Sequence, residues 1–346
     1  MCRGPAGARR ENLFLQPVGV RRSRVSFKAG GPPRSPMDLG LYIRPAQTYG
    51  AMVELARHAE GLGLFGVFLN DHVEGLSGDR REPYLESWTA LTGIGAETRR
   101  IRLGHITLFN SLRNPALLAK MISALDVMTG GRYETIMGAG WSEPEYRGYD
   151  LMGEGRGMPS AGERVTRLKE AVQILRGMFD SEVFRFRGRY WRLEEAVNVP
   201  GPVQRPMRIS VGARQGRMIR IAAKYADGMN GSGNLRAIRG YVKTLAPELE
   251  AAGKRMGDFF LSGFTTFTLT RSEAETEAVL ARVAKGRPLE EVRDDFFVGT
   301  PEVLVGKLRE CADLGMKMMI VIPMSSRVEE IGSTAERLRD EVFSQL

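Results

Sequence analysis

Eight short apolar runs separated by amphipathic segments are the feature that most constrains the fold of this chain. The runs are continuous rather than alternating with polar residues, which is typical of strands buried on both faces of a sheet. Such strands are parallel, and a crossover connection, usually a helix, joins each one to the next. The predicted strands are residues 37–43, 64–70, 101–109, 132–140, 207–213, a short run within 227–233, 259–269 and 317–323.

The segments between these runs carry helical periodicity. The clearest example is 162–179, where apolar residues recur at spacings of 3 and 4. A helix start is also indicated by Thr300-Pro301-Glu302, which supplies an N-cap, a proline in the first turn and an acid at the positive end of the helix dipole. The predicted helices are residues 47–62, 84–98, 115–129, 162–179, 215–226, 234–253, 300–314 and 333–345, with a further charged helical region at 272–297.

Eight strands that alternate with helices predict a (β/α)8 TIM barrel. A doubly wound open sheet is the alternative, but it would carry a glycine fingerprint after the first strand, and LYIRPAQTYG (41–50) has none. GLGLFG (61–66) matches GxGxxG, yet it follows a helix and opens a strand, the reverse of a dinucleotide-binding turn. Aromatic residues and arginines around Gly188 (183–193) predict a two-stranded insertion after the fourth helix.

The positive charge of the chain is concentrated at its start. Residues 1–36 hold eight Arg and Lys and one acid, so they account for +7 of the net charge of +9 and leave +2 for the rest. This segment is rich in Gly, Pro and Arg and lacks apolar periodicity. We expect a disordered basic extension at 1–36 or translated sequence upstream of the true start, with a targeting peptide as the alternative, and a single barrel domain at 37–346. The nearly neutral domain gives no reason to expect nucleic-acid binding.

Composition excludes several other classes. No apolar run approaches the ~18 residues of a membrane span, so we expect no membrane partner. The two cysteines, Cys2 and Cys311, lie far apart in sequence, which excludes a disulfide scaffold and favours a cytoplasmic location. The three histidines, His58, His72 and His105, are too dispersed to predict a metal site.

Barrel active sites lie at the carboxyl ends of the strands, so the residues that follow each strand are the candidates. Asp71 and His72 come directly after the second strand, ahead of a polar loop. Neighbours on an extended segment point in opposite directions, so adjacency alone does not make them a working pair, and a structural role is equally open. His105 lies inside the third strand, where it either faces the barrel interior or packs structurally.

Two glycine-containing turns indicate a large cofactor that carries phosphate. In GARQGR (212–217), small residues and arginines lie at the start of a helix, whose free N–H groups suit an anion. GAG (138–140), after the fourth strand, would let a flat ring approach the backbone. Ordinary strand-to-helix turns also use glycine, so a purely structural explanation stays open for each.

Taken together and in order, these motifs resemble the bacterial luciferase-like superfamily and, through the Asp-His pair, its coenzyme F420-dependent branch. That branch includes methylenetetrahydromethanopterin reductases and F420-dependent dehydrogenases. The resemblance covers 37–325 and is carried by NDHVEG, by the run from WTALTGIGAETRR to GAGWSEPEYRGY, by ERVTRLKEAVQILRGMF, by VNVPGPVQRPMRISVGARQGR and by FVGTPEVLVGKL.

The resemblance implies that F420, or FMN as the alternative, lies across the barrel mouth. His72 would serve as base or hydrogen-bond partner near the hydride centre, and Asp71 would help to position the ring. The family's non-prolyl cis peptide would fall within His105–Thr107. The implied cofactor-binding residues are Asp71, His72, His105, Ile106, Thr107, Asn110, Gly138, Ala139, Gly140, Gly212, Ala213, Arg214, Gln215 and Gly216, and the implied substrate pocket is Trp141, Glu145 and Asn230.

One departure concerns the substrate. Sugar-phosphate dehydrogenases of this branch have an acid directly after the glycines of the fourth strand, where this chain has Trp141. This argues against a sugar phosphate and for an apolar or aromatic substrate; Glu143 and Glu145 are nearby but shifted, and no general acid is assigned.

The predicted activity is hydride transfer between the deazaflavin and a small organic substrate. A methylenetetrahydromethanopterin-like compound is one candidate for that substrate. The alternatives are an FMN-dependent monooxygenase that incorporates O2 and a non-catalytic cofactor-binding barrel. A homodimer is expected from the resemblance alone.

Overall fold

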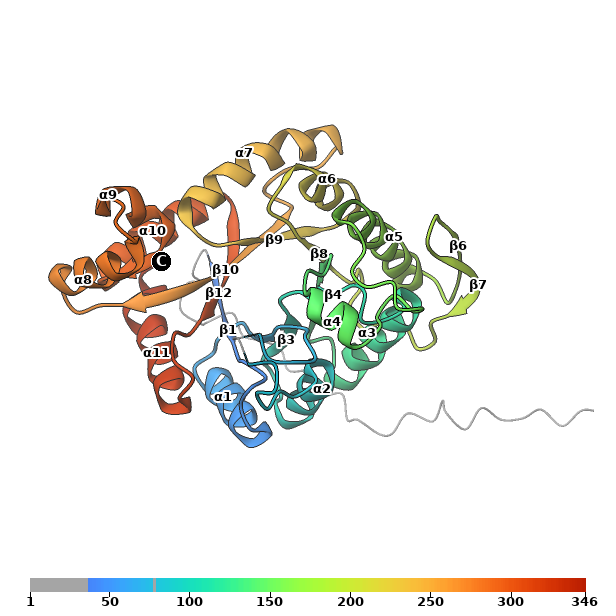
Figure 1. The fold of residues 1–346 in the computed structure, drawn as a ribbon, viewed down its shortest axis with the longest axis horizontal. Coiled ribbons are helices and arrows are strands. Elements are labelled where there is room, and N and C mark those ends of the chain that lie inside the picture. The colour runs from blue at the N-terminus through green and yellow to red at the C-terminus, as the bar shows by residue number, and fades with distance from the viewer. Residues whose placement is uncertain (1–36, 77–78) are drawn as a thin grey trace, which may run out of the picture. The chain divides into compact units, whose positions relative to one another are not determined.

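Eight parallel strands close into a barrel in the computed structural model, which describes residues 37–76 and 79–346 (Figure 1). Strand β12 pairs with β1, and β9 pairs with β10, so the ring has no open edge. The prediction of a TIM barrel is confirmed, whereas the predicted extension 1–36 lies outside the described residues. The barrel strands are β1 (Asp38–Tyr42), β2 (Gly66–Leu69), β3 (Arg102–His105), β5 (Tyr133–Gly138), β8 (Ile209–Gly212), β9 (Gly228–Ser232), β10 (Phe260–Leu269) and β12 (Met316–Ile322).

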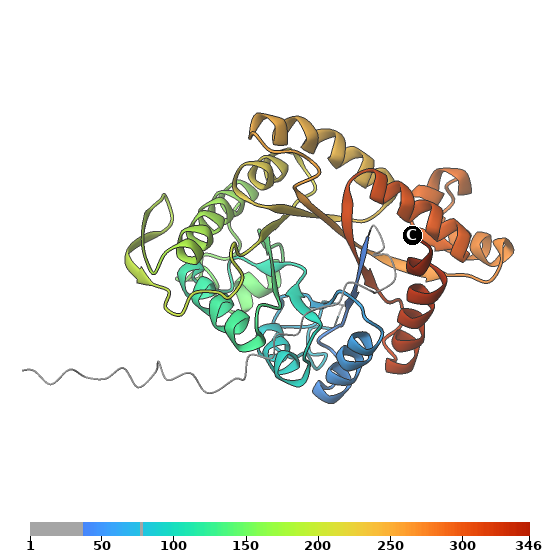
Figure 2. The ribbon, with the colours of Figure 1, turned by 180° about the vertical axis from the view of Figure 1, so that it is seen from behind.

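Helices cover the outside of this ring, as the view from the opposite side also shows (Figure 2). They are α1 (Tyr49–Gly61), α2 (Ser87–Glu97), α3 (Pro115–Thr129), α5 (Ala161–Asp180), α6 (Gly216–Tyr225), α7 (Leu235–Ala251), α10 (Pro301–Asp313) and α11 (Val328–Glu341). A large apolar core fills the space between strands and helices, and a small separate cluster of Phe68, Ile106, Ile136, Met318 and Ile320 fills the barrel interior. Among the described residues, no helix is both long enough and apolar enough to cross a membrane.

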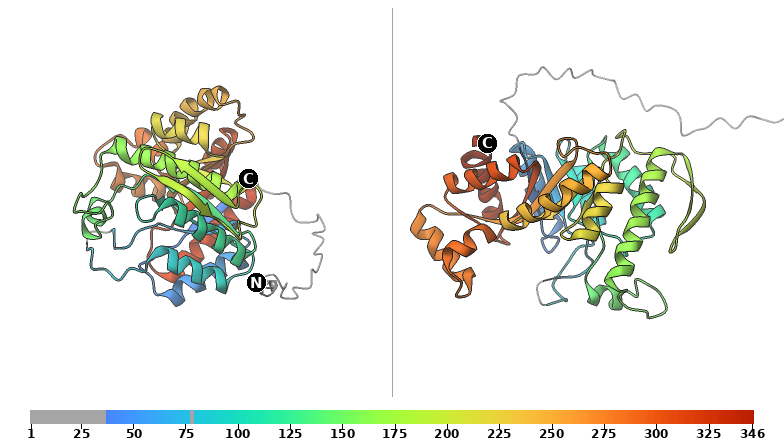
Figure 3. Two further views of the ribbon diagram at one scale, coloured as in Figure 1. Left: turned by 90° about the vertical axis from the view of Figure 1, so that its right-hand side faces the viewer. Right: turned by 90° about the horizontal axis from the view of Figure 1, so that it is seen from above.

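The predicted insertion is an antiparallel hairpin of β6 (Val183–Arg187) and β7 (Arg192–Val197), which follows α5 and lies alongside it (Figure 3). Its turn is held by one buried carboxylate, Glu170, which accepts hydrogen bonds from three consecutive backbone N–H groups at 189–191. The hairpin is therefore attached to the barrel through α5 and does not enter the ring of strands.

Some short elements were not expected from the sequence. The predicted strand 101–109 is interrupted by a cis peptide between Ile106 and Thr107, so β3 ends at His105 and the separate strand β4 (Leu108–Phe109) pairs with β5. The charged region predicted to be helical contains α8 (Glu273–Ala284), α9 (Leu289–Val292) and a 3-10 turn (Arg293–Asp295). It ends in strand β11 (Phe297–Gly299), which pairs in parallel with the carboxyl end of β10. A short helix, α4 (Glu143–Gly148), follows β5.

A buried carboxylate closes the amino-terminal end of the barrel. Glu134, near the start of β5, accepts a hydrogen bond from Arg102 and another from Arg208 (2.6 Å). The guanidinium carbon of Arg208 lies 3.6 Å from the ring centre of Phe260. Glu134 is buried while the arginines are partly exposed, and Arg102 also donates to Gln204 and to the Gly131 carbonyl. Loss of the carboxylate removes the negative charge that both arginines share.

We predict that Glu134→Gln lowers the free energy of unfolding by about 3 kcal/mol, because it removes one partner of a buried ion network. Urea denaturation followed by circular dichroism measures this change. Glu194→Gln is the matched control, since the Glu194 side chain is 81% exposed and pairs only with Arg192 among the described residues. Equal unfolding free energies for the two variants would contradict the prediction.

Candidate active site

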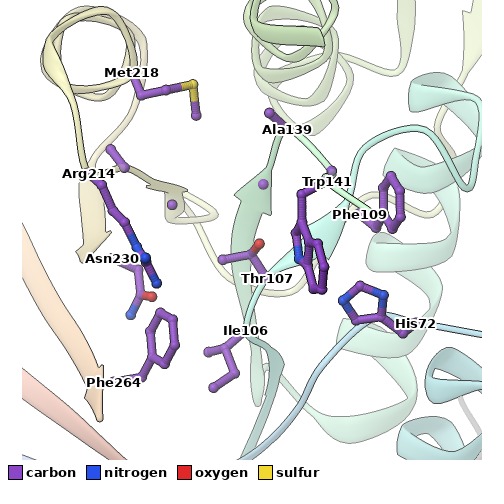
Figure 4. Close-up of a pocket in the computed structure, with 14 residues that line it drawn as sticks. His72, Ile106, Thr107, Phe109, Ala139, Trp141, Arg214, Met218, Asn230 and Phe264 are labelled. Atoms are coloured by element: carbon purple, nitrogen blue, oxygen red, sulfur yellow. The ribbon is translucent and has the colours of Figure 1, made fainter. Parts of the chain in front are cut away.

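A cavity of about 440 Å³ lies at the carboxyl ends of the strands, where a barrel active site is expected (Figure 4). The predicted site residues that line this cavity are His72, Ile106, Thr107, Gly138, Ala139, Gly140, Trp141, Gly212, Ala213, Arg214 and Asn230. Phe109, Met218 and Phe264, which were not predicted, complete the lining. The predicted residues that do not line it are Asp71, His105, Asn110, Glu145, Gln215 and Gly216.

The segment Asn70–His72, which follows β2, is anchored by the side chain of Asn70 and by its backbone carbonyl groups. Asn70 Oδ1 accepts hydrogen bonds from the hydroxyls of Tyr42 (3.0 Å) and Tyr84 (2.7 Å). The hydroxyl of Ser87, at the start of α2, donates to the backbone carbonyl of Asn70 and lies 3.3 Å from that of His72. The backbone that carries Asp71 and His72 is thus fixed from two sides.

Asp71 is buried and binds the segment that follows the cis peptide. Its Oδ2 accepts hydrogen bonds from the backbone N–H of Phe109 (2.8 Å) and from Arg113 Nη1 (2.7 Å). Phe109 lines the cavity, but Asp71 does not. Asp71 would therefore help to position a ring through the residues that it holds, Phe109 and Arg113.

His72 lines the cavity and has a carboxylate behind it. Its Nδ1 lies 2.6 Å from Glu145 Oε2, and Glu145 Oε1 accepts a hydrogen bond from the backbone N–H of Val73 (2.8 Å). The imidazole is also in edge contact with the rings of Phe109 (5.8 Å) and Trp141 (5.5 Å). These contacts hold the imidazole in one orientation at the cavity wall.

Glu145 lies in α4 and is fully buried. Burial by itself would raise the pKa of this carboxyl, but the hydrogen bond and charge interaction with His72 and the hydrogen bonds from Val73 and Ser142 outweigh burial and hold the pKa below its usual range. Glu145 was expected in the substrate pocket; instead it lies behind His72. Sequence reasoning missed this pairing because 73 residues separate the two side chains.

The glycines after β5 and β8 make room for the chain's own side chains. A Cβ on Gly138 would lie 2.0 Å from Thr107 Oγ1, and one on Gly212 would lie 2.8 Å from Thr107 Cγ2. Gly140 has a φ of +79°, and a Cβ there would lie 2.0 Å from the ring of Phe109. These glycines line the cavity as expected, but the contacts that require them are with Thr107 and Phe109.

The cis peptide Ile106–Thr107 lies within the range that the resemblance implied.

A buried oxygen without a partner faces the cavity from the opposite wall. Asn230, in β9, is 1% exposed and its Nδ2 donates to Ser262 Oγ (2.9 Å), whose own hydroxyl is directed to the carbonyl of Met229 (3.3 Å). This network leaves Asn230 Oδ1 with no hydrogen-bond partner among the described residues. Figure 4 shows that oxygen on the cavity side. Because buried acceptors are almost always satisfied, a donor from a ligand or from water would complete its hydrogen bonding.

Arg214 is the one cationic side chain in the lining of this cavity, within the part of the chain that the structure describes. It is exposed and lies in the turn between β8 and α6, above Asn230 in Figure 4. Gln215 and Gly216, at the start of α6, are adjacent in sequence but do not line the cavity. An anion near Arg214 would therefore lie at the cavity rim.

His105 and Asn110 lie outside the cavity, although the resemblance implied cofactor contacts for both. His105 is fully buried on the outer side of the strand, where it stacks on Trp88 (5.4 Å, 8°) and its Nδ1 lies 2.9 Å from the Tyr133 hydroxyl. Burial lowers the pKa of His105 from 6.5 to about 4. Asn110 donates its backbone N–H to Gly138 (3.1 Å) and thereby ties β4 to the end of β5. Both residues support the wall rather than form it.

The sequence profile of the luciferase-like monooxygenase family matches residues 31–291 of this chain. An F420-dependent glucose-6-phosphate dehydrogenase from Nakamurella multipartita is 28% identical over 311 residues, which is 81% of this chain and 88% of the relative. Pyrimidine monooxygenase RutA from Methylobacterium radiotolerans is 27% identical over 302 residues, or 77% of each chain.

Solved structures share the fold. An F420-dependent secondary alcohol dehydrogenase in complex with an F420-acetone adduct has a TM-score of 0.73 at 16% identity and covers 89% of this chain and 98% of its own. The coenzyme F420-dependent tetrahydromethanopterin reductase from Methanopyrus kandleri has a TM-score of 0.71 at 19% identity and covers 89% and 99%. At these identities the likeness concerns the fold.

We predict that His105 makes the protein less stable in mild acid. In the unfolded chain His105 takes up a proton near pH 6.5, whereas in the folded chain it does so only near pH 4. The contribution of neutral His105 to folding stability is therefore fully present above pH 6.5 and is lost as the pH falls toward 4. The loss over this window is about 3 kcal/mol for this group. The measurement is the difference in unfolding free energy between wild type and His105→Gln across the window.

Tyr133→Phe is the matched control for this measurement. It removes the hydroxyl near Nδ1 but leaves the imidazole buried, so the acid dependence should persist. A His105→Gln variant with the same dependence as wild type would contradict the assignment.

Proposed function

The chain belongs to the luciferase-like monooxygenase family, a family of enzymes, and on that premise we propose that it is an F420-dependent oxidoreductase that transfers a hydride between the deazaflavin and a small organic substrate. The family expected from the motifs is confirmed by the profile match. The observation that carries the proposal is a cavity with a carboxylate-backed imidazole, His72, on one wall and an unsatisfied acceptor, Asn230 Oδ1, on the other.

The residues present suit such a cofactor. A deazaflavin carries ring N–H groups and a hydroxylated chain, and either could donate to Asn230 Oδ1, which has no donor among the described residues. Arg214 and the amino-terminal end of α6 would hold the cofactor phosphate at the rim. Gly138–Gly140 and Thr107 would form the wall beneath the ring. When bound, the deazaflavin supplies the two-electron chemistry.

His72 would handle the proton. A neutral imidazole with Nδ1 on a carboxylate presents Nε2 as an acceptor, and histidine is suited to proton transfer near neutral pH. When a substrate hydroxyl is oxidised to a carbonyl, His72 would take up the hydroxyl proton, and in the reverse direction it would return that proton. Asp71 would act indirectly by holding Phe109 and Arg113.

The lining favours an apolar or aromatic substrate over a sugar phosphate. Trp141 is 63% exposed at the cavity, and Phe109, Met218 and Phe264 contribute further apolar surface. No carboxylate lines the cavity in the described ranges. An exposed indole beside His72 offers a stacking face for a planar or apolar group.

An FMN-dependent monooxygenase is the second candidate. The relative named as a pyrimidine monooxygenase favours it, since that protein aligns over a share of the chain similar to that of the F420-dependent relative. The acceptor at Asn230 would suit the N–H groups of either ring, so the cavity walls do not separate the two cofactors.

A homodimer in the cytoplasm completes the proposal, with no nucleic-acid partner. Helix α3 leaves Leu117 (56%) exposed near its start and Met128 (67%) exposed near its end. Residues with this spacing lie on the same face of a helix, about 16 Å apart, so both could contribute to one interface. The small number of cysteines supports a reducing compartment.

We predict that the purified protein binds F420 in a fluorescence titration, and FMN is titrated separately as the alternative cofactor. Asn230→Ala should weaken F420 binding about tenfold, because it removes a buried acceptor worth about 1–2 kcal/mol. His72→Ala should keep the affinity and lose turnover. Tight FMN binding without F420 binding would favour the monooxygenase, and binding of neither would leave a barrel without this cofactor.

We also predict a dimer in sedimentation velocity. The double variant Leu117→Glu with Met128→Glu should shift the protein to monomer, because it places charges on the exposed face of α3. A matched change on an exposed residue of another helix, Lys243→Glu in α7, should leave the dimer intact. A wild-type monomer would contradict the homodimer.

A further inference from the structure

We infer that Glu145 is the positioning residue that keeps the proton of neutral His72 on Nδ1 and the lone pair on Nε2. The inference concerns the tautomer of one imidazole; only its consequence for turnover rests on the proposed function. Carboxylates that hold an imidazole in this way fix both its orientation and the nitrogen that serves as base.

Both oxygens of Glu145 already have defined partners. Oε1 accepts from the backbone N–H of Val73 (2.8 Å), and Oε2 lies 2.6 Å from His72 Nδ1. A backbone amide can only donate, so Oε1 must be an acceptor. The side chain is fully buried, so water has no access to rearrange this pairing.

The second contact also has only one possible direction at neutral pH. Burial raises the pKa of Glu145, but the hydrogen bond and charge interaction with His72, together with the hydrogen bonds from Val73 and Ser142, outweigh burial and hold that pKa below its usual range, so the group is a carboxylate. An ionised carboxylate only accepts hydrogen bonds, which requires Nδ1 to carry the proton. In a neutral imidazole the other nitrogen, Nε2, is then the acceptor.

Nε2 is the nitrogen left for the cavity. His72 is one of the lining residues, and the side-chain hydrogen bond of its ring within 37–76 and 79–346 is made by Nδ1. Phe109 and Trp141 contact the imidazole edge-on and restrict its rotation. Glu145 itself does not line the cavity, so it would act through His72 and not on the substrate.

A glutamine at this position would reverse the tautomer. Its amide must place the carbonyl oxygen against the N–H of Val73, because the NH2 group cannot accept that hydrogen bond. The NH2 group then faces His72 Nδ1 and donates to it. Nδ1 becomes an acceptor, the proton moves to Nε2, and the cavity receives a donor instead of a base. Shape and burial change little, so packing alone would not produce this result.

The test is the tautomer of His72, read by long-range ¹H–¹⁵N correlation on protein labelled with ¹⁵N-histidine. Spectra are recorded without cofactor over a rising pH series, and the tautomer is read where the His72 signals stop changing and the ring is neutral. The chain has three histidines, and His72→Ala assigns the signals of His72 by their loss. Wild type should show the Nδ1–H form and Glu145→Gln the Nε2–H form.

Glu143→Gln is the matched control. Glu143 lies on the same short helix, is exposed and pairs with Arg147 (2.9 Å), so its change should leave His72 in the Nδ1–H form. An Nε2–H form in wild type, or an unchanged tautomer in Glu145→Gln, would overturn the inference.

Turnover provides the second arm. Once F420-dependent activity is measurable, Glu145→Gln should lower kcat by about 100-fold to 10,000-fold with F420 affinity within about twofold. Glu143→Gln should match wild type in both. Loss of turnover without a change of tautomer would contradict the inference. If F420 does not bind, the proposed function fails while the tautomer experiment still decides the inference.

Discussion

The rigid attachment of the segment Asn70–His72 to the barrel rim is the constraint on which the site depends. Successive side chains of an extended segment point in opposite directions, so Asp71 and His72 do not pair with each other. Asp71 instead binds the backbone of Phe109, and His72 meets Glu145 on the other side. Each residue thereby connects β2 to a different part of the rim. The cavity wall is held in place before any ligand arrives, which is what a site for proton transfer requires.

The second constraint is the space around Thr107. Its side chain occupies the positions that Cβ atoms on Gly138 and Gly212 would need, so three strands approach one another closely at the mouth. Asn110 adds a backbone hydrogen bond to Gly138 at the same place. The glycine-rich turns are therefore part of the barrel's packing as well as of the cavity surface, and replacing them would disturb the wall before it affected a ligand.

The order of elements could be predicted from the sequence because buried parallel strands and amphipathic helices leave strong periodic signals. The predicted helix 115–129 coincides with α3, and the insertion at 183–193 falls within the hairpin β6–β7. Apolar character alone does not reveal a change of backbone direction, so the run 101–109 was predicted as one strand. Whether His105 faces inward or outward depends on register. Its place against Trp88 was therefore not predictable.

The candidate site could be predicted only in part, because the sequence pattern locates strand ends but not the packing of short helices. Residues at strand ends, such as His72 and Asn230, are placed by the barrel itself, and they line the cavity. Glu145 is placed by a six-residue helix, and its contact with His72 depends on how that helix packs, which no local pattern encodes.

The central claim is that the nitrogen of His72 left free by Glu145 faces the reacting ring of the cofactor. The most direct measurement is a crystal structure of the protein with F420. The account predicts the deazaflavin in the cavity, its reacting carbon beside His72 Nε2 and a donor on Asn230 Oδ1; a ring bound elsewhere, or an Nε2 turned away from it, would contradict the account.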